Sequence, residues 1–180
     1  MERRVGAEEA SMLIAQGNLA RTYQALERHE EALDMQQEIY SGRLKINGEE
    51  DGETLREANN CAISLIQLHR FEEAKSVLRK IIPVARRVLG DSHDNTLRMR
   101  RNYARALYKD DGATLDDLRE AVTENDELER TARRVLGSAH PLTGAIEESL
   151  QETRAVLRAC EGGDVGAVRA ALDAMTVRKN

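Results

Sequence analysis

Apolar residues recur at steps of three and four along most of the chain, which is the spacing of one face of an α-helix. Between Glu8 and Arg28, for example, Met12, Leu19 and Tyr23 follow this spacing. The pattern predicts helices over about residues 8–28, 30–46, 53–68, 71–89, 95–108, 115–136 and 142–160. After Gly162-Gly163 it predicts a short last helix over 164–175, for which Asp164 is a candidate N-cap.

The helical pattern repeats with a period of 42 residues. Asn18-Leu19-Ala20 is followed by Asn60-Cys61-Ala62 and then by Asn102-Tyr103-Ala104. A fixed period of this length indicates stacked helical units, each too small to bury its own apolar face. We expect a single helical repeat domain over residues 1–180, with repeats at about 8–52, 53–94 and 95–141 and a cap at about 142–175. Five extra residues in the third repeat fall in its turn, between Ala104 and Ala121.

Composition narrows the class of protein further. The formal net charge of −5 argues against a duplex-binding protein, which usually carries a strong basic excess. The two cysteines, Cys61 and Cys160, form no disulfide framework, and no apolar run is long enough for a signal peptide or a membrane span. We therefore expect a soluble, cytoplasmic protein.

The repeat resembles the tetratricopeptide repeat, and more narrowly the 42-residue type of kinesin light chains. The resemblance covers about residues 11–143 and rests on small residues at two fixed places in each unit: Ala20 and Ala32, Ala62 and Ala74, Ala104 and Ala121. In that family, the two helices of a hairpin touch at these places. The resemblance implies an all-α fold, a right-handed α-solenoid of about three tetratricopeptide helix pairs followed by a C-terminal capping helix pair.

Three features depart from the family pattern. Glu27 and His69 stand where the family usually has a glycine before the turn. The first link between repeats, residues 46–51, is degenerate compared with the links at 88–93 and 135–141. The stretch 163–172 faintly resembles the opening of an ankyrin repeat, so residues 161–175 are either a cap or the start of such a repeat.

In tetratricopeptide arrays the first helix of each pair lines a concave groove, and the resemblance carries eighteen groove positions over to this chain. Six of them are basic and none is acidic, where the composition would put about three acids. The residues expected to bind a partner are Asn18, Arg21, Arg56, Asn59, Asn60, Ile63, Ile66, Arg98, Arg101, Asn102, Arg105, Tyr108 and Lys109.

These residue types suit capture of an extended, acidic peptide of another protein. An asparagine amide both donates and accepts, so Asn18, Asn60 and Asn102 could pair with a peptide backbone of any sequence. Arginine binds carboxylates in a bidentate way, and we expect the second and third units to carry most of the affinity. Two alternatives stay open: the arginines form a solvated helix face, and the asparagines cap or pair within the repeats.

The sequence is compatible with one other class of function and argues against several more. The main alternative is a structural subunit or fragment of a larger assembly that uses its convex face or the ends of the solenoid, and self-association through those ends is compatible with either hypothesis. Single-stranded RNA is disfavoured because Tyr108 is the only aromatic groove residue. No catalytic pattern surrounds either cysteine or any histidine, so we expect no enzyme, no cofactor, no metal and no membrane insertion.

Overall fold

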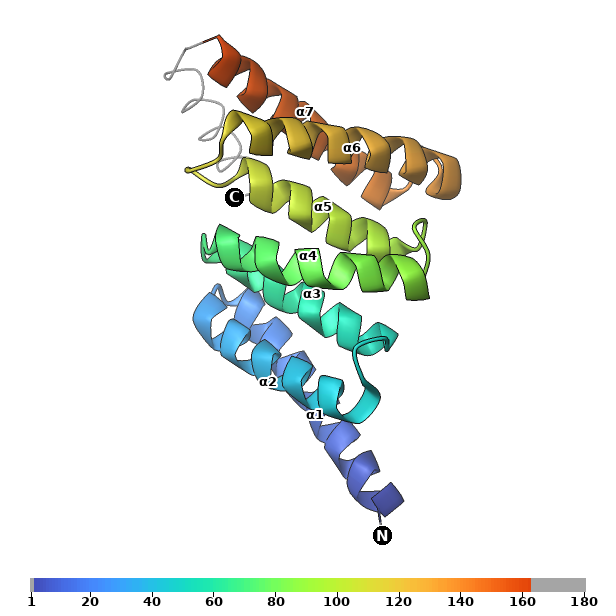
Figure 1. Ribbon diagram of the computed structural model, residues 1–180. Coiled ribbons are helices and arrows are strands. Elements are labelled where there is room, and N and C mark those ends of the chain that lie inside the picture. Colours follow the sequence, from blue (N-terminus) through green and yellow to red (C-terminus); the bar gives the residue numbers. More distant parts are fainter. Residues whose placement is uncertain (1, 163–180) are drawn as a thin grey trace. The chain divides into compact units, whose positions relative to one another are not determined.

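Helices make up almost all of residues 2–162, which are the residues that the computed structural model describes; side chains are described from Ser11 onward (Figure 1). The helices are α1 (Glu2–Ala25), α2 (His29–Asn47), α3 (Gly52–Gln67), α4 (Phe71–Val88), α5 (Asp94–Tyr108), α6 (Leu115–Leu136) and α7 (Pro141–Glu161). Residues 2–162 contain no strand, so the all-α prediction is confirmed. The predicted helix bounds agree to within one residue except in α1, which starts at Glu2 and ends at Ala25. The last predicted helix, and with it the choice between a cap and an ankyrin-like start, lies outside the described residues.

The chain divides into two compact units, residues 1–91 and residues 92–180, called here the N-terminal and the C-terminal unit. In the N-terminal unit α1 packs on α2, α2 on α3 and α3 on α4. In the C-terminal unit α6 packs on both α5 and α7, and α5 also contacts α7. The second unit begins three residues before the predicted start of the third repeat at residue 95, while the expectation of a single domain stays a prediction.

Small residues lie where the helices of each pair cross. None of the six alanines that carry the family resemblance is more than 2% exposed: Ala20, Ala32, Ala62, Ala74, Ala104 and Ala121. A side chain of one carbon lets two helix backbones approach closely, and larger apolar residues fill the space on either side. Around Ala104 and Ala121, for example, Leu107, Leu118 and Val156 form a buried cluster.

The first two hairpin turns place a residue other than glycine in the left-handed region. Glu27 has φ 59° and His69 has φ 57°, at the two positions where the family usually has a glycine. The third turn is longer and is followed by a capping box at the start of the next helix. Thr114 accepts a hydrogen bond from the backbone N–H of Asp117, and the Asp117 carboxylate accepts one from the backbone N–H of Thr114. This capping box starts α6.

The helices α3, α5 and α7 begin with an N-cap residue at the same position of the repeat, but the side-chain group that accepts the hydrogen bond differs. The backbone N–H of Thr54 donates to Asp51 Oδ2 at 2.9 Å and so caps α3. At α5 and α7 the cap acceptor is a histidine Nδ1, on His93 and on His140, each at 3.2 Å from a backbone nitrogen. Asp51, His93 and His140 are spaced by 42 and 47 residues, like the rest of the repeat. The degenerate first link therefore keeps the cap although it lacks the histidine.

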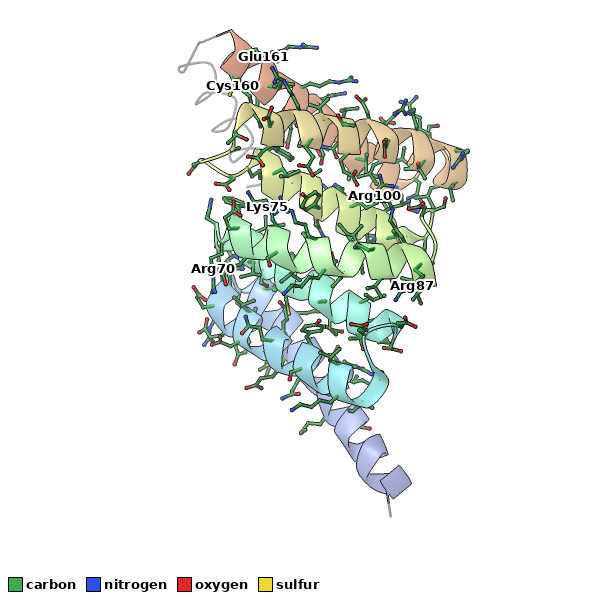
Figure 2. All side chains as sticks on the ribbon, viewed as in Figure 1. Arg70, Lys75, Arg87, Arg100, Cys160 and Glu161 are labelled. Carbon is green, nitrogen blue, oxygen red and sulfur yellow. The ribbon has the colours of Figure 1, made fainter. Side chains whose placement is uncertain are left out.

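One arginine of α5 is buried among polar partners. Arg100, labelled in Figure 2, is 3% exposed; its guanidinium donates to Glu124 at 2.5 Å and to Glu127 at 3.1 Å, both on α6. An unpaired buried charge is costly, so these carboxylates compensate for the burial of Arg100. Arg100 therefore links α5 to α6 and is not one of the groove positions.

Candidate interaction surface

A pocket of about 290 Å³ lies between the first helices of the N-terminal unit. Its walls come from α1 and α3, with one residue from α2, and its lining residues are Leu13, Ile14, Gly17, Asn18, Arg21, Arg43, Glu53, Arg56 and Glu57. The pocket brings together three of the predicted binding residues, Asn18, Arg21 and Arg56. It adds Arg43, which sequence analysis missed because that residue belongs to a second helix.

The charges in this pocket are mixed. Arg56 pairs with Glu53 at 2.5 Å and with Glu57 at 3.3 Å, and Asn60 donates to Glu57 at 3.0 Å. Glu57 is only 6% exposed, and it was not among the eighteen positions assigned to the groove. Three arginines thus face two glutamates. The Nε atoms of Arg43 and Arg56 are buried and have no hydrogen-bond acceptor within the described part of the chain. Such donors favour a further acceptor in the pocket.

The remaining predicted residues of this unit differ in exposure. Asn59 and Ile66 are buried, and Asn60 and Ile63 are half-buried. Asn18 and Arg21, by contrast, are exposed. The first two asparagines of the common register are therefore not equivalent: the Asn60 amide donates to Glu57, whereas Asn18 lines the pocket.

In the C-terminal unit the predicted residues of α5 contact α7 as well as solvent. Arg101 Nε donates to the backbone oxygen of Ala145 at 3.2 Å, and the Tyr108 hydroxyl donates to Glu152 at 2.7 Å. Arg98 is exposed and forms an ion pair with Asp94 at 2.6 Å on its own helix. Asn102 is buried. The sequence predicts α7 to be part of the C-terminal cap. This helix thus supplies hydrogen-bond acceptors to the surface that carries the predicted binding residues of α5.

Burial and neighbouring charges shift the pKa of two of these groups. Burial lowers the pKa of Arg101, although Tyr108 and the α7 carboxylates Glu148 and Glu152 act in the opposite direction. Burial, reinforced by the Glu152 carboxylate, raises the pKa of Tyr108. The Lys109 ammonium lies 6.0 Å from the centroid of the Tyr108 ring. The face carried by α5 and α7 therefore combines cationic and anionic side chains.

The cysteines and the metal-ligating residue types add no further site. Burial, together with the nearby Glu57 carboxylate, raises the pKa of the Cys61 thiol to about 12, which keeps the thiol protonated and unreactive. Among the side chains of residues 11–162, no group of three or more His, Cys, Asp or Glu could hold a metal ion. Over the same residues no helix is both long and apolar enough to cross a membrane.

Comparison with known proteins identifies the class. The fold is an all-α repeat fold of the α-solenoid class, and residues 9–84 match the family description of the tetratricopeptide repeat. This match, together with the solved structures below, confirms the resemblance of the sequence to tetratricopeptide repeats. Repeats of this family generally act in protein–protein interaction and are typically non-enzymatic.

Solved structures extend the likeness over the whole chain. A protein of Podosopora anserina, described as a putative kinesin light chain with nearly identical TPR-like repeats, is 22% identical, with a TM-score of 0.63. The match covers 99% of this chain and 85% of that one. A point variant of the same protein is 24% identical, with a TM-score of 0.65 and coverage of 98% and 85%. At this identity the likeness is one of fold. None of the curated proteins compared with the chain matches it.

Proposed function

We propose that this protein is a non-enzymatic scaffold that binds an extended, acidic peptide segment of another protein along the first helices of its repeats. The observation that carries the proposal is the pocket between α1 and α3, in which Arg21, Arg43 and Arg56 outnumber Glu53 and Glu57. A ligand carboxylate between Arg21 and Arg43 would meet a net positive charge and a buried donor without an acceptor. Asn18 lies in the same pocket and can pair with a peptide backbone.

The α5–α7 surface supports a second contact in the same proposal. Arg105 is half-buried, and its Nε has no acceptor within the described part of the chain. Glu148 and Glu152 lower the net charge of this surface, so the acidic ligand is expected to meet Arg105 and Lys109 more favourably than Arg101. The N-terminal pocket, which includes the first unit, is therefore expected to contribute at least as much affinity as the α5 residues, in place of the sequence-based expectation that the second and third units carry most of it.

The test is fluorescence anisotropy with a labelled library of acidic peptides. Arg21→Glu combined with Arg43→Glu should weaken binding at least about tenfold, because two like charges replace the ligand's partners. A charge-matched control combines Lys80→Glu with Arg130→Glu, two exposed positions outside the pocket, and should bind like the natural protein. Added salt should weaken binding by the natural protein.

Two outcomes would contradict the proposal. One is no binding of any acidic peptide by a natural chain whose circular dichroism shows full helix. The other is equal loss of binding in the pocket variant and in the charge-matched control, because that would indicate a general charge effect. Either result would favour the alternative, a structural subunit that makes contacts through its convex face or its ends. The double variant Arg101→Glu with Arg105→Glu tests the second contact separately.

A further inference from the structure

The outer face of α1 lacks the cover that the equivalent face of α3 has. Within the N-terminal unit α3 packs on α2, and Thr54 and Cys61 of α3 are 1% and 4% exposed. Cys61 lies close enough to Tyr40 of α2 to contribute to raising the pKa of that tyrosine. The residues 42 positions earlier, Met12 and Leu19, are large and apolar and are 55% and 43% exposed. The face that the repeat uses for stacking is therefore open on α1.

A pocket of about 920 Å³ lies along this face, between α1 and α2. Leu13 lies against Gly42 in the lining of this pocket, and even an added Cβ on Gly42 would come within 2.9 Å of the leucine. The charged lining residues are segregated along α2. Asp34 and Glu38 lie toward one end and Lys45 toward the other, about 16 Å from Asp34 at the helical rise.

The apolar residues of the face are arranged in a similar way. Because α1 and α2 run antiparallel as a hairpin, Leu19 lies beside the acidic end of the pocket. Ile46, which is 43% exposed, lies at the end that carries Lys45. Two copies meet face to face about a two-fold axis that lies in the plane of the face. An axis that crosses both helices near Leu13 and Gly42 exchanges the two ends of α2 and places the acidic end of one copy over the basic end of the other, so the face is complementary to itself in charge.

We propose that this face binds a second copy of the chain, in a two-fold symmetric dimer whose axis passes near Leu13 and Gly42. A two-fold interface uses one patch twice, which requires the self-complementarity described above. In the dimer Lys45 of each copy lies opposite Glu38 of the other, and Met12 is covered near the axis. The face shares only the buried Leu13 with the pocket between α1 and α3, and none of the residues changed in the two sets of experiments is common to both, so each proposal can fail without the other.

The size of the face sets the expected strength of the dimer. It extends over about 18 Å of α2 and is two helices, or about 20 Å, wide. This is small beside stable interfaces, which bury about 800 Å² on each partner. We therefore expect a reversible dimer with a dissociation constant in the micromolar range.

Sedimentation velocity of the full chain, from low micromolar to near-millimolar concentration, tests the proposal. The natural protein should shift from monomer to dimer over this range. Met12→Glu should raise the dissociation constant at least about tenfold, because Met12 lines the pocket near the axis and the change sets the carboxylates of the two copies against one another. Val135→Glu is the matched control: Val135 of α6 is 46% exposed, and its replacement should leave the dimer unchanged.

A charge exchange tests the two-fold arrangement itself. Glu38→Lys and Lys45→Glu should each weaken the dimer, because each sets two like charges against one another at both ends. Mixed together, the two variants should form heterodimers, because the lysine introduced into one chain would then meet the glutamate introduced into the other. A natural chain that stays monomeric throughout, a dimer insensitive to Met12→Glu, or a mixture without heterodimers would each overturn the proposal.

Discussion

Glu27 holds a backbone conformation that costs free energy in any residue except glycine. A residue with a side chain pays roughly 1 kcal/mol in the left-handed region because its Cβ approaches the carbonyl oxygen. The neighbouring side chains support the turn. The Arg28 guanidinium lies 4.6 Å from the Tyr23 ring centroid and forms an ion pair with Glu31 at 2.7 Å. Contacts that flank the turn thus stabilise a conformation that position 27 itself disfavours.

Glu27→Gly should stabilise the protein. Removing the Cβ relieves the left-handed conformation, and we expect the free energy of unfolding to rise by roughly 1 kcal/mol, as glycine is the preferred residue at such helix ends. Urea denaturation followed by circular dichroism measures the change. Gln37→Gly, at an exposed position inside α2, is the control and should lower stability by a similar amount. A loss of stability in Glu27→Gly would show that the Glu27 side chain itself stabilises the turn.

At the same scale, the candidate site was only partly predictable from sequence. Register within the repeat selected Asn18, Arg21 and Arg56, and the structure brings these three together in one pocket. It could not find Glu57, because that residue is not at one of the family's groove positions, although it lines the pocket and pairs with Arg56. Nor could it find Glu152, since hydrogen bonding to Tyr108 depends on how α7 packs against α5.

At the scale of an element, the start of α3 depends on the charge of one side chain. Burial alone would raise the pKa of Asp51, but hydrogen bonds from Thr54 and Asn47 to its carboxylate outweigh that effect and lower the pKa below its usual value. A carboxyl group with a lowered pKa in the folded state stabilises that state above the pKa it has when unfolded, about 3.9. The contribution is lost as the pH falls through the lower, folded-state pKa.

Asp51→Ala should therefore lower the free energy of unfolding by about 1 kcal/mol at pH 7, the usual cost of losing an N-cap. The difference from the natural protein should shrink below about pH 4, as the Asp51 carboxyl takes up a proton. Urea denaturation over a pH series measures both effects. Asp111→Ala, at an exposed position in the third turn, should be neutral throughout. A deficit that stays constant down to pH 3 would mean that packing, and not the carboxylate, explains it.

Elements were more predictable than the site because the same physical constraints recur in every unit. Each hairpin needs small residues at its crossing and a stop at its end, so the period of 42 fixed most helix bounds to within one residue. The first helix is the exception: it begins at Glu2, since the residues ahead of Glu8 include no proline that would end it. The cap at Asp51 was missed because an aspartate and a histidine supply the same acceptor without sequence similarity.

At the scale of the molecule, stability is distributed over local contacts. Among the described residues the helices that pack within a unit are neighbours in sequence, apart from the pair α5 and α7. The apolar clusters follow the same rule: Leu13, Ala20 and Ile39 form one in the N-terminal unit, and Leu97 and Leu128 belong to one in the C-terminal unit. In proteins built this way, stability is close to a sum of terms from each repeat and its neighbours.

A destabilising substitution in one unit should therefore lower the stability mainly of that unit. Ala104→Leu forces three extra carbons into the crossing of α5 and α6, where Ala104 is fully buried, and should cost about 1–3 kcal/mol. Native-state hydrogen exchange should show faster exchange in α5–α7 and little change in α1 and α2. Ala62→Leu, at the equivalent crossing of α3 and α4, is the reciprocal variant and should show the opposite pattern. If either variant accelerated exchange equally in every helix, the two units would unfold as one cooperative structure, and the local account of stability would be wrong.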